Sequence, residues 1–219
     1  MIPSQHKIRV LVVDDSAVAR AFLIKGLSAY PNIEVVGYAI NALDAKAKIT
    51  RLNPDVMTLD VEMPGTNGID FLKQLLPEHP LPVILVSSLN LRVFDALAAG
   101  AVDFVRKPDG VESREAFLRA LSQKIVVAYR AKVAPCPRTA AKQSAAVVPA
   151  AALGRGSGLV DLDRTIIGLG ASTGGTEATL EVLKRLPADI PGMVIVQHMP
   201  KGFTGMYAQR LNKLCAMEV

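Results

Sequence analysis

Between residues 7 and 128, short runs of valine, isoleucine and leucine alternate with amphipathic segments. The apolar runs lie at Ile8–Val13, Glu34–Ala39, Val56–Leu59, Val83–Ser87 and Asp103–Val105. Continuous apolar runs are typical of strands that are covered on both faces of a sheet. The intervening segments predict helices at 16–30, 42–52, 69–76, 92–99 and 114–129, with Ser16 and Asn41 as suitable N-caps. This alternation predicts an α/β domain built on a doubly wound, five-stranded parallel sheet.

Acidic residues end two of these strands. Asp14 and Asp15 follow the first apolar run, and Asp60 closes the third. Doubly wound sheets bind ligands beyond the carboxyl ends of their strands, so we expect the three carboxylates to share one edge of the sheet. Three carboxylates in one cleft repel each other unless a cation lies among them. The sequence therefore predicts a Mg²⁺ site that contains one reactive aspartate.

Asp60 is the candidate phosphate acceptor of this site. A carboxylate is a poor nucleophile, and a divalent cation offsets the charge of an incoming phosphoryl group. Beside Asp60, we expect Asp15 to bind the cation directly, Asp14 to bind it through water, and the backbone carbonyl of Glu62 to supply a further ligand.

Two more polar groups follow later strands. Ser87 ends the fourth strand and offers a hydroxyl to a phosphoryl oxygen, and Lys107, after the fifth strand, offers a positive charge. A cis peptide bond before Pro108 would aim this lysine inward. The strand ends thus carry polar groups in a fixed order: an acid pair at the first strand, an acid at the third, a hydroxyl at the fourth and a lysine at the fifth.

Residues 7–128 therefore resemble the response-regulator receiver domain. The matching residues are Asp14, Asp15, Asp60, Ser87 and Lys107, with Phe104 where the family often carries an aromatic switch. The resemblance implies phosphotransfer from a histidine kinase to Asp60. It also implies that Ser87 and Phe104 then rearrange and alter the face formed by the fourth helix, fifth strand and fifth helix.

The pattern changes after this domain. Residues 129–162 are rich in alanine, proline, glycine and serine and predict a flexible linker. Order resumes in residues 163–219, with strands expected at 165–170 and 193–197 and helices at 176–186 and 204–214. This second unit looks like the opening βαβα of another doubly wound, Rossmann-like α/β hydrolase domain.

The glycine-rich run at 168–175 follows the first strand of this unit and opens its helix. A dinucleotide-binding loop fits it poorly, because Gly174 lies one residue late and no acid ends the second strand. The alternative is a G-x-S-x-G turn that presents Ser172 as a nucleophile. Ser172 is also a possible helix N-cap. Because parallel strands of a βαβ unit end at the same edge, Ser172 and His198 should emerge together as nucleophile and general base.

The chain resembles the chemotaxis protein-glutamate methylesterases, which also deamidate glutamines. The resemblance lies in the combination of a receiver domain, a linker and the two motifs GASTGG and QHMP. The resemblance implies that Ser172 attacks the side-chain carbonyl of a methylated glutamate or a glutamine on a methyl-accepting chemoreceptor. It implies that His198 transfers the proton, that Thr173 supports the site, and that a chemotaxis histidine kinase phosphorylates Asp60. In this family the unphosphorylated receiver packs over the catalytic cleft.

The triad of this family also contains an aspartate from later in the domain, which these 219 residues do not include. Asp189 and Glu218 are poor substitutes by position. Since loss of the orienting acid from such a triad costs about 10⁴ in turnover, we expect this polypeptide to be feebly esterolytic. Two alternatives stand beside the enzyme: a receiver that only accepts phosphate and carries an inert hydrolase remnant, and a transcription regulator. The strand and glycine-rich turn after residue 165 argue against a transcription regulator, because a DNA-binding output domain would need a basic helix-turn-helix in this part of the chain.

Composition excludes several other classes. Most of the net charge of +5 lies in residues 129–162, the predicted linker. A nucleic-acid-binding protein is expected to concentrate basic residues on a folded face, so the charge distribution argues against this class. No apolar stretch approaches the roughly 18–20 residues of a membrane span, and no signal peptide is evident, so we expect a cytoplasmic protein without membrane insertion. The two cysteines, Cys136 and Cys215, have no metal-ligand spacing.

Overall fold

The structure is a computed structural model that describes residues 7–63, 68–87, 92–108, 113–130, 162 and 164–219. Nearly all of the predicted linker lies outside the described residues. Within them, no helix combines the length and the apolar character that crossing a bilayer requires.

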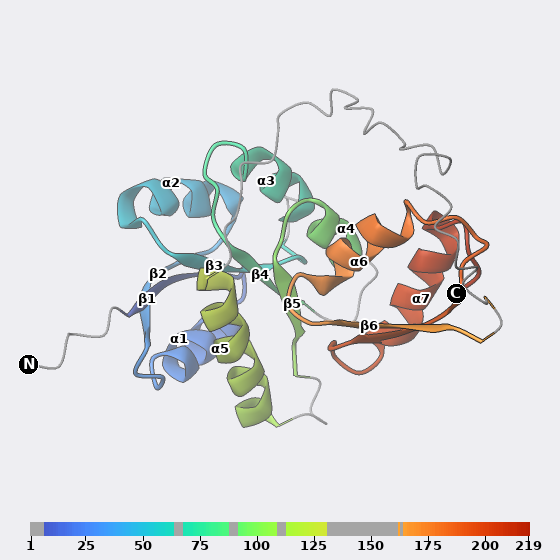
Figure 1. Cartoon of the computed structure of the whole chain (residues 1–219). Coiled ribbons are helices and arrows are strands. Elements are labelled where there is room, and N and C mark those ends of the chain that lie inside the picture. Colours follow the sequence, from blue (N-terminus) through green and yellow to red (C-terminus); the bar gives the residue numbers. More distant parts are fainter. Residues whose placement is uncertain (1–6, 64–67, 88–91, 109–112, 131–161, 163) are drawn as a thin grey trace, which may run out of the picture.

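The first part of the chain forms a five-stranded parallel sheet, as predicted (Figure 1). Its strands have the order β2-β1-β3-β4-β5. Their bounds are β1 Ile8–Val13, β2 Ile33–Ala39, β3 Val56–Asp60, β4 Val83–Ser87 and β5 Asp103–Arg106. Every residue of β3 and β4 is buried, which explains why both read as unbroken apolar runs in the sequence.

Helices cover both faces of this sheet. Their bounds are α1 Ala17–Leu27, α2 Ala42–Leu52, α3 Gly68–Leu75, α4 Arg92–Ala98 and α5 Arg114–Arg130. The side chains of α1 and α5 share one apolar cluster with the sheet, and those of α2, α3 and α4 share the cluster on the opposite face. Ser16 and Asn41 accept hydrogen bonds from backbone N–H groups at the starts of α1 and α2, so both predicted N-caps are confirmed.

A second, two-stranded parallel sheet follows. It pairs β6 (Ile166–Ala171) with β7 (Gly192–Gln197), and α6 (Gly175–Leu183) and α7 (Phe203–Leu214) complete the βαβα unit. Side chains alternate along both strands: one face packs toward the helices, and the other exposes Ile166, Val194 and Val196. Each predicted element of this unit is present, with helix α6 three residues shorter at its C-terminal end than expected.

An aromatic cluster joins the two parts of the chain. The ring of Phe203 on α7 lies 4.5 Å from that of Phe104 on β5 and 6.3 Å from that of Phe94 on α4. Tyr207, one turn further along α7, stacks on Phe94 at 5.7 Å. Phe94, Phe104, Phe203 and Tyr207 are all buried, so the apolar cluster on the α2–α4 side of the large sheet continues into the second unit. Aromatic pairs of this kind add to the free energy gained by burying their area.

Candidate functional site

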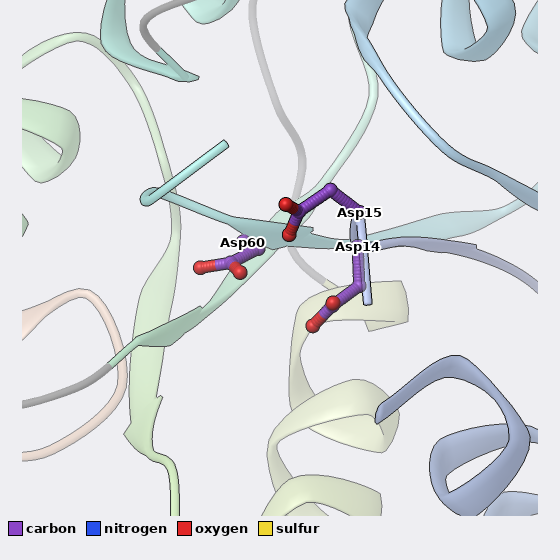
Figure 2. A group of neighbouring side chains, drawn as sticks. All are labelled: Asp14, Asp15 and Asp60. Atoms are coloured by element: carbon purple, nitrogen blue, oxygen red, sulfur yellow. The ribbon is translucent and has the colours of Figure 1, made fainter. Parts of the chain in front are cut away.

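The fold brings the three predicted acids together at the carboxyl edge of the large sheet (Figure 2). Asp14 and Asp15 follow β1, and Asp60 is the last residue of the neighbouring strand β3. One carboxylate oxygen from each lies within 4.8 Å of the others. Asp14 and Asp60 are buried, whereas Asp15 is exposed at the mouth of the cluster. The cluster has the all-oxygen donor set that Mg²⁺ prefers.

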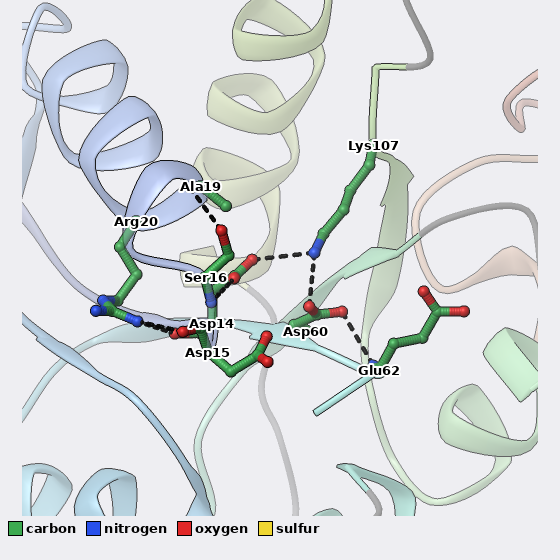
Figure 3. Close-up of polar contacts among 8 residues, drawn as sticks. All are labelled: Asp14, Asp15, Ser16, Ala19, Arg20, Asp60, Glu62 and Lys107. Atoms are coloured by element: carbon green, nitrogen blue, oxygen red, sulfur yellow. Dashed lines mark hydrogen bonds and ion pairs between the residues drawn. The ribbon is translucent and has the colours of Figure 1, made fainter. Parts of the chain in front are cut away.

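Lys107 connects two of these acids (Figure 3). Its ammonium group lies 2.6 Å from Oδ2 of Asp60 and 3.1 Å from Oδ2 of Asp14. The lysine therefore reaches the acidic cluster from the end of β5, as the order of strand ends predicts. The prediction of a cis bond before Pro108 is wrong, since no peptide bond among the described residues is cis.

Burial and charge act in opposite directions on this pair. Burial raises the pKa of the Asp60 carboxyl, and the negative charge of Asp14 adds to this, while Lys107 and the N–H of Glu62 partly oppose them. For Lys107, burial lowers the pKa, but Asp60 and Asp14 outweigh burial, and the pKa lies above its usual value. The ammonium group is therefore positive at neutral pH and partly neutralises an acidic cluster that is costly to ionise.

Backbone contacts fix the two loops that carry the acids. The N–H of Glu62 donates to Oδ1 of Asp60 at 3.0 Å, and the N–H of Ser16 donates to Oδ1 of Asp14 at 2.8 Å. Arg20 on α1 donates to the carbonyl oxygens of Asp14 and Asp15 at 2.8 and 2.9 Å (Figure 3). Sequence reasoning missed Arg20, because an arginine in the first turns of an amphipathic helix gives no signal that it folds back onto the preceding loop.

Among the described residues, the buried Oγ of Ser87 at this edge has no hydrogen-bond partner, and Oδ2 of Asp14 makes no hydrogen bond beyond its ion pair with Lys107. Ser87 is fully buried at the end of β4, next to β3 in the sheet. Buried polar groups are normally paired, so the unpartnered Ser87 hydroxyl fits a site that binds a further group. Mg²⁺ suits the carboxylate and a phosphoryl oxygen suits the hydroxyl, as expected from the sequence.

We expect Asp15→Asn to weaken Mg²⁺ binding by about 10–100-fold or more, because it removes one charged ligand while leaving the buried acids in place. Titration of the chain with Mn²⁺ as a paramagnetic substitute measures this affinity. Asp70→Asn is the matched control, since Asp70 is an exposed acid on α3. Equal affinities for wild type and Asp15→Asn would remove Asp15 from the metal site.

The second candidate site lies at the paired ends of β6 and β7. The register pairs Ala171 with Gln197, so Ser172 and His198 are the next residue on each strand. The N–H of His198 donates to the carbonyl oxygen of Ala171 at 3.1 Å. Both predicted residues are exposed. The structure thus places Ser172 and His198 at the same edge of the sheet, although no hydrogen bond joins their side chains in the described part of the chain.

The alternative role of Ser172 as a helix N-cap is wrong. Helix α6 begins at Gly175, its N-cap is Gly174, and no side chain caps it. Gly174 has a φ of 75°, a left-handed conformation that glycine adopts without strain. The turn from Ser172 to Gly174 therefore leaves the serine hydroxyl and the neighbouring Thr173 free of any capping role.

Two family comparisons cover these sites. The model of the response regulator receiver domain matches residues 10–118, and the model of the CheB methylesterase matches residues 167–219. Among solved structures, the response regulator domain of Thermotoga maritima CheB is 42% identical, with a TM-score of 0.54. That match covers 58% of this chain and 99% of the Thermotoga chain.

Curated relatives match almost the whole chain. A protein-glutamate methylesterase/protein-glutamine glutaminase from Syntrophotalea carbinolica is 50% identical over 97% of this chain and 61% of its own length. A second protein of the same name, numbered 2, from Syntrophomonas wolfei is 47% identical over 98% of this chain and 60% of its own length. The chain thus spans about three fifths of the length of these relatives.

Proposed function

The chain belongs to the CheB-type response regulators, which join a receiver domain to a methylesterase domain, and we propose that phosphorylation of Asp60 controls ester hydrolysis at Ser172. The substrates are glutamate methyl esters, and glutamine side chains, on methyl-accepting chemoreceptors. The phosphodonor is a chemotaxis histidine kinase. The observation that carries the proposal is the packing of the receiver face, through Phe94 and Phe104, on the helix that follows His198.

The acidic cluster supports the first half of this proposal. A carboxylate oxygen of Asp60 attacks the phosphorus of a phosphohistidine, the N–P bond breaks, and an acyl phosphate forms. Asp14, Asp15 and Asp60 would hold a Mg²⁺ ion, which would offset the charge of the phosphoryl group. The ion pair of Lys107 with Asp60, and a Ser87 hydroxyl without a partner among the described residues, support a role for both in binding phosphoryl oxygens.

The serine–histidine edge supports the second half. Oγ of Ser172 attacks the carbonyl carbon of the ester while the His198 imidazole accepts the hydroxyl proton. The tetrahedral intermediate collapses, and His198 returns the proton to the departing methoxide, which leaves as methanol. Water then hydrolyses the acyl-serine and releases the glutamate. With glutamine as substrate, the same steps release ammonia.

Contacts between the two parts support regulation of one site by the other. Arg106 at the end of β5 donates to the carbonyl oxygen of Lys201 at 3.3 Å. Val105, Arg106 and Lys124 of the receiver line a narrow cleft whose opposite wall is His198, Met199 and Pro200. The receiver therefore stands beside the proposed general base. Phosphorylation at Asp60 would act on this wall through β4 and β5, whose ends carry Ser87 and Lys107.

A receiver that only accepts phosphate is the second candidate, because the acidic cluster of Asp14, Asp15 and Asp60 lies entirely within the receiver. Methanol release separates the two. We expect wild type, incubated with methylated receptor and phosphodonor, to release methanol at a rate that Ser172→Ala abolishes. Thr204→Ala, a hydroxyl removed from the exposed side of α7, is the matched control. Release by Ser172→Ala at the wild-type rate would contradict the proposed nucleophile, and no release from wild type would favour the phosphate-accepting module.

A further inference from the structure

Gln197, the last residue of β7, connects the backbones that carry Ser172 and His198. Its Nε2 donates to the carbonyl oxygen of Ser172 at 2.9 Å and to that of His198 at 3.2 Å. The N–H of Gly175 donates to the same Ser172 carbonyl at 2.7 Å. One amide thus joins the turn after β6 to the residue after β7.

The side chain of Gln197 is confined where it makes these bonds. Its Oε1 is buried and has no hydrogen-bond partner in the part of the chain that the structure describes. A Cβ at position 175 would collide with this Oε1 and would lie 2.6 Å from Cβ of Ala171. The glycine at 175 therefore leaves the space that the amide occupies. Because the oxygen gains no hydrogen bond there, the two bonds from Nε2 are the favourable interactions that explain the position of this side chain.

The rest of the edge gives Ser172 and His198 little support. Both residues are exposed and both follow the last paired residues of their strands. One backbone hydrogen bond, from the N–H of His198 to the carbonyl of Ala171, crosses between the strands at this level. A nucleophile and its base need to lie within about 3 Å of each other for proton transfer, which two exposed strand ends do not secure by themselves.

We propose that Gln197 is the positioning residue of this site, and that its amide holds Ser172 and His198 in the register in which imidazole and hydroxyl meet. The role rests on the proposed function, since it presumes that these two side chains react as a pair. Both hydrogen bonds of the Gln197 amide go to backbone carbonyl groups and not to the side chains of the pair. It acts through the two carbonyl groups that it binds.

The test replaces Ser172 with cysteine and follows alkylation of that thiol by iodoacetamide as a function of pH. Reaction is read at residue 172 by peptide mass spectrometry, so the two native cysteines do not contribute. A neighbouring imidazole lowers the pKa of a thiol, and each unit of lowering increases the thiolate fraction about tenfold below the ordinary pKa. Amide hydrogen exchange at Gly175 and His198 is measured on the same proteins with the native serine.

Two substitutions remove the donors. Gln197→Glu keeps the shape and places carboxylate oxygens against two carbonyls, and Gln197→Met keeps the length without any polar atom. We expect either change to slow alkylation of the cysteine near neutral pH by about tenfold, and we expect the same of His198→Gln. We also expect exchange at Gly175 and His198 to accelerate. Gln209→Met, at an exposed glutamine on α7, should leave both measurements unchanged.

The outcomes separate the inference from the function on which it rests. If His198→Gln shifts the pH profile and the Gln197 variants change neither alkylation nor exchange, the positioning role is overturned while the serine–histidine pair stands. If His198→Gln leaves the profile unchanged, the pair itself fails, and the positioning role fails with it.

Discussion

Asp60→Asn is expected to abolish Mg²⁺-dependent uptake of acid-labile phosphate, lowering the rate by about 10⁴-fold or more, as loss of a nucleophile does in other enzymes. The amide has nearly the shape of the carboxylate and can still accept the hydrogen bond from Glu62 N–H. It lacks the charge that makes Asp60 both nucleophile and metal ligand. Phosphotransfer from radiolabelled kinase, followed by release of the label from the chain with neutral hydroxylamine, which cleaves acyl phosphates, measures the effect.

The geometry of Asp60 separates lost chemistry from lost folding. Burial raises the pKa of this carboxyl, and Asp14 repels its charge, so its ionised form is unfavourable in the folded protein. A neutral amide removes that cost, and Asp60→Asn should therefore remain folded. Asp70→Asn, on the exposed side of α3, should accept phosphate at the wild-type rate. Equal labelling of Asp60→Asn and wild type would show that another residue is the acceptor.

Phe203→Ala is expected to detach the second unit from the receiver. The ring of Phe203 is fully buried between Phe94 and Phe104, and its removal leaves a cavity at the centre of the contact. Truncation of a buried phenylalanine destabilises by about 3–5 kcal/mol, which corresponds to an acceleration of amide exchange on the order of 10²–10⁴-fold in the segments that it anchors. Exchange measured by mass spectrometry should rise in α7 and along the α4–β5 face.

Phe22→Ala is the matched control for this change. Phe22 lies on α1 and stacks on Phe117, on the opposite side of the sheet from the contact. Its removal should accelerate exchange in α1 and α5 and leave α6 and α7 unchanged. If Phe203→Ala instead left protection of the α4–β5 face intact, the aromatic cluster would not be what joins the two units.

Much of this structure could be predicted from local sequence patterns. Runs such as Val56–Asp60 form strands because both faces of the sheet are covered, and their acidic ends converge because parallel strands share one edge. Ser16 and Asn41 are N-caps because their short side chains accept backbone N–H bonds. Asp14, Asp15, Asp60 and Lys107 meet as predicted, while the roles assigned to them, and to Ser172 and His198, stay predictions.

The remaining features depend on contacts between distant residues. No local pattern indicates that Phe203 meets Phe104, since an apolar residue at the start of a helix has many possible partners. Arg20 and Gln197 escaped notice for a related reason. Each acts by donating to backbone carbonyls, and every residue carries a carbonyl, so nothing in the sequence identifies which ones are bound. Lys107 contacts Asp60 with a trans peptide bond before Pro108, so the predicted cis bond is not needed for this contact.

Amide hydrogen exchange with and without Mg²⁺ and beryllofluoride, which mimics a phosphoryl group on aspartate, tests the central claim that the acidic site governs the serine site. Occupancy of the acidic site should accelerate exchange in α7 and at the β7 end near His198, and Asp60→Asn should eliminate that response. A response confined to the loops around Asp14 and Asp60, with α7 and His198 unchanged, would contradict the coupling.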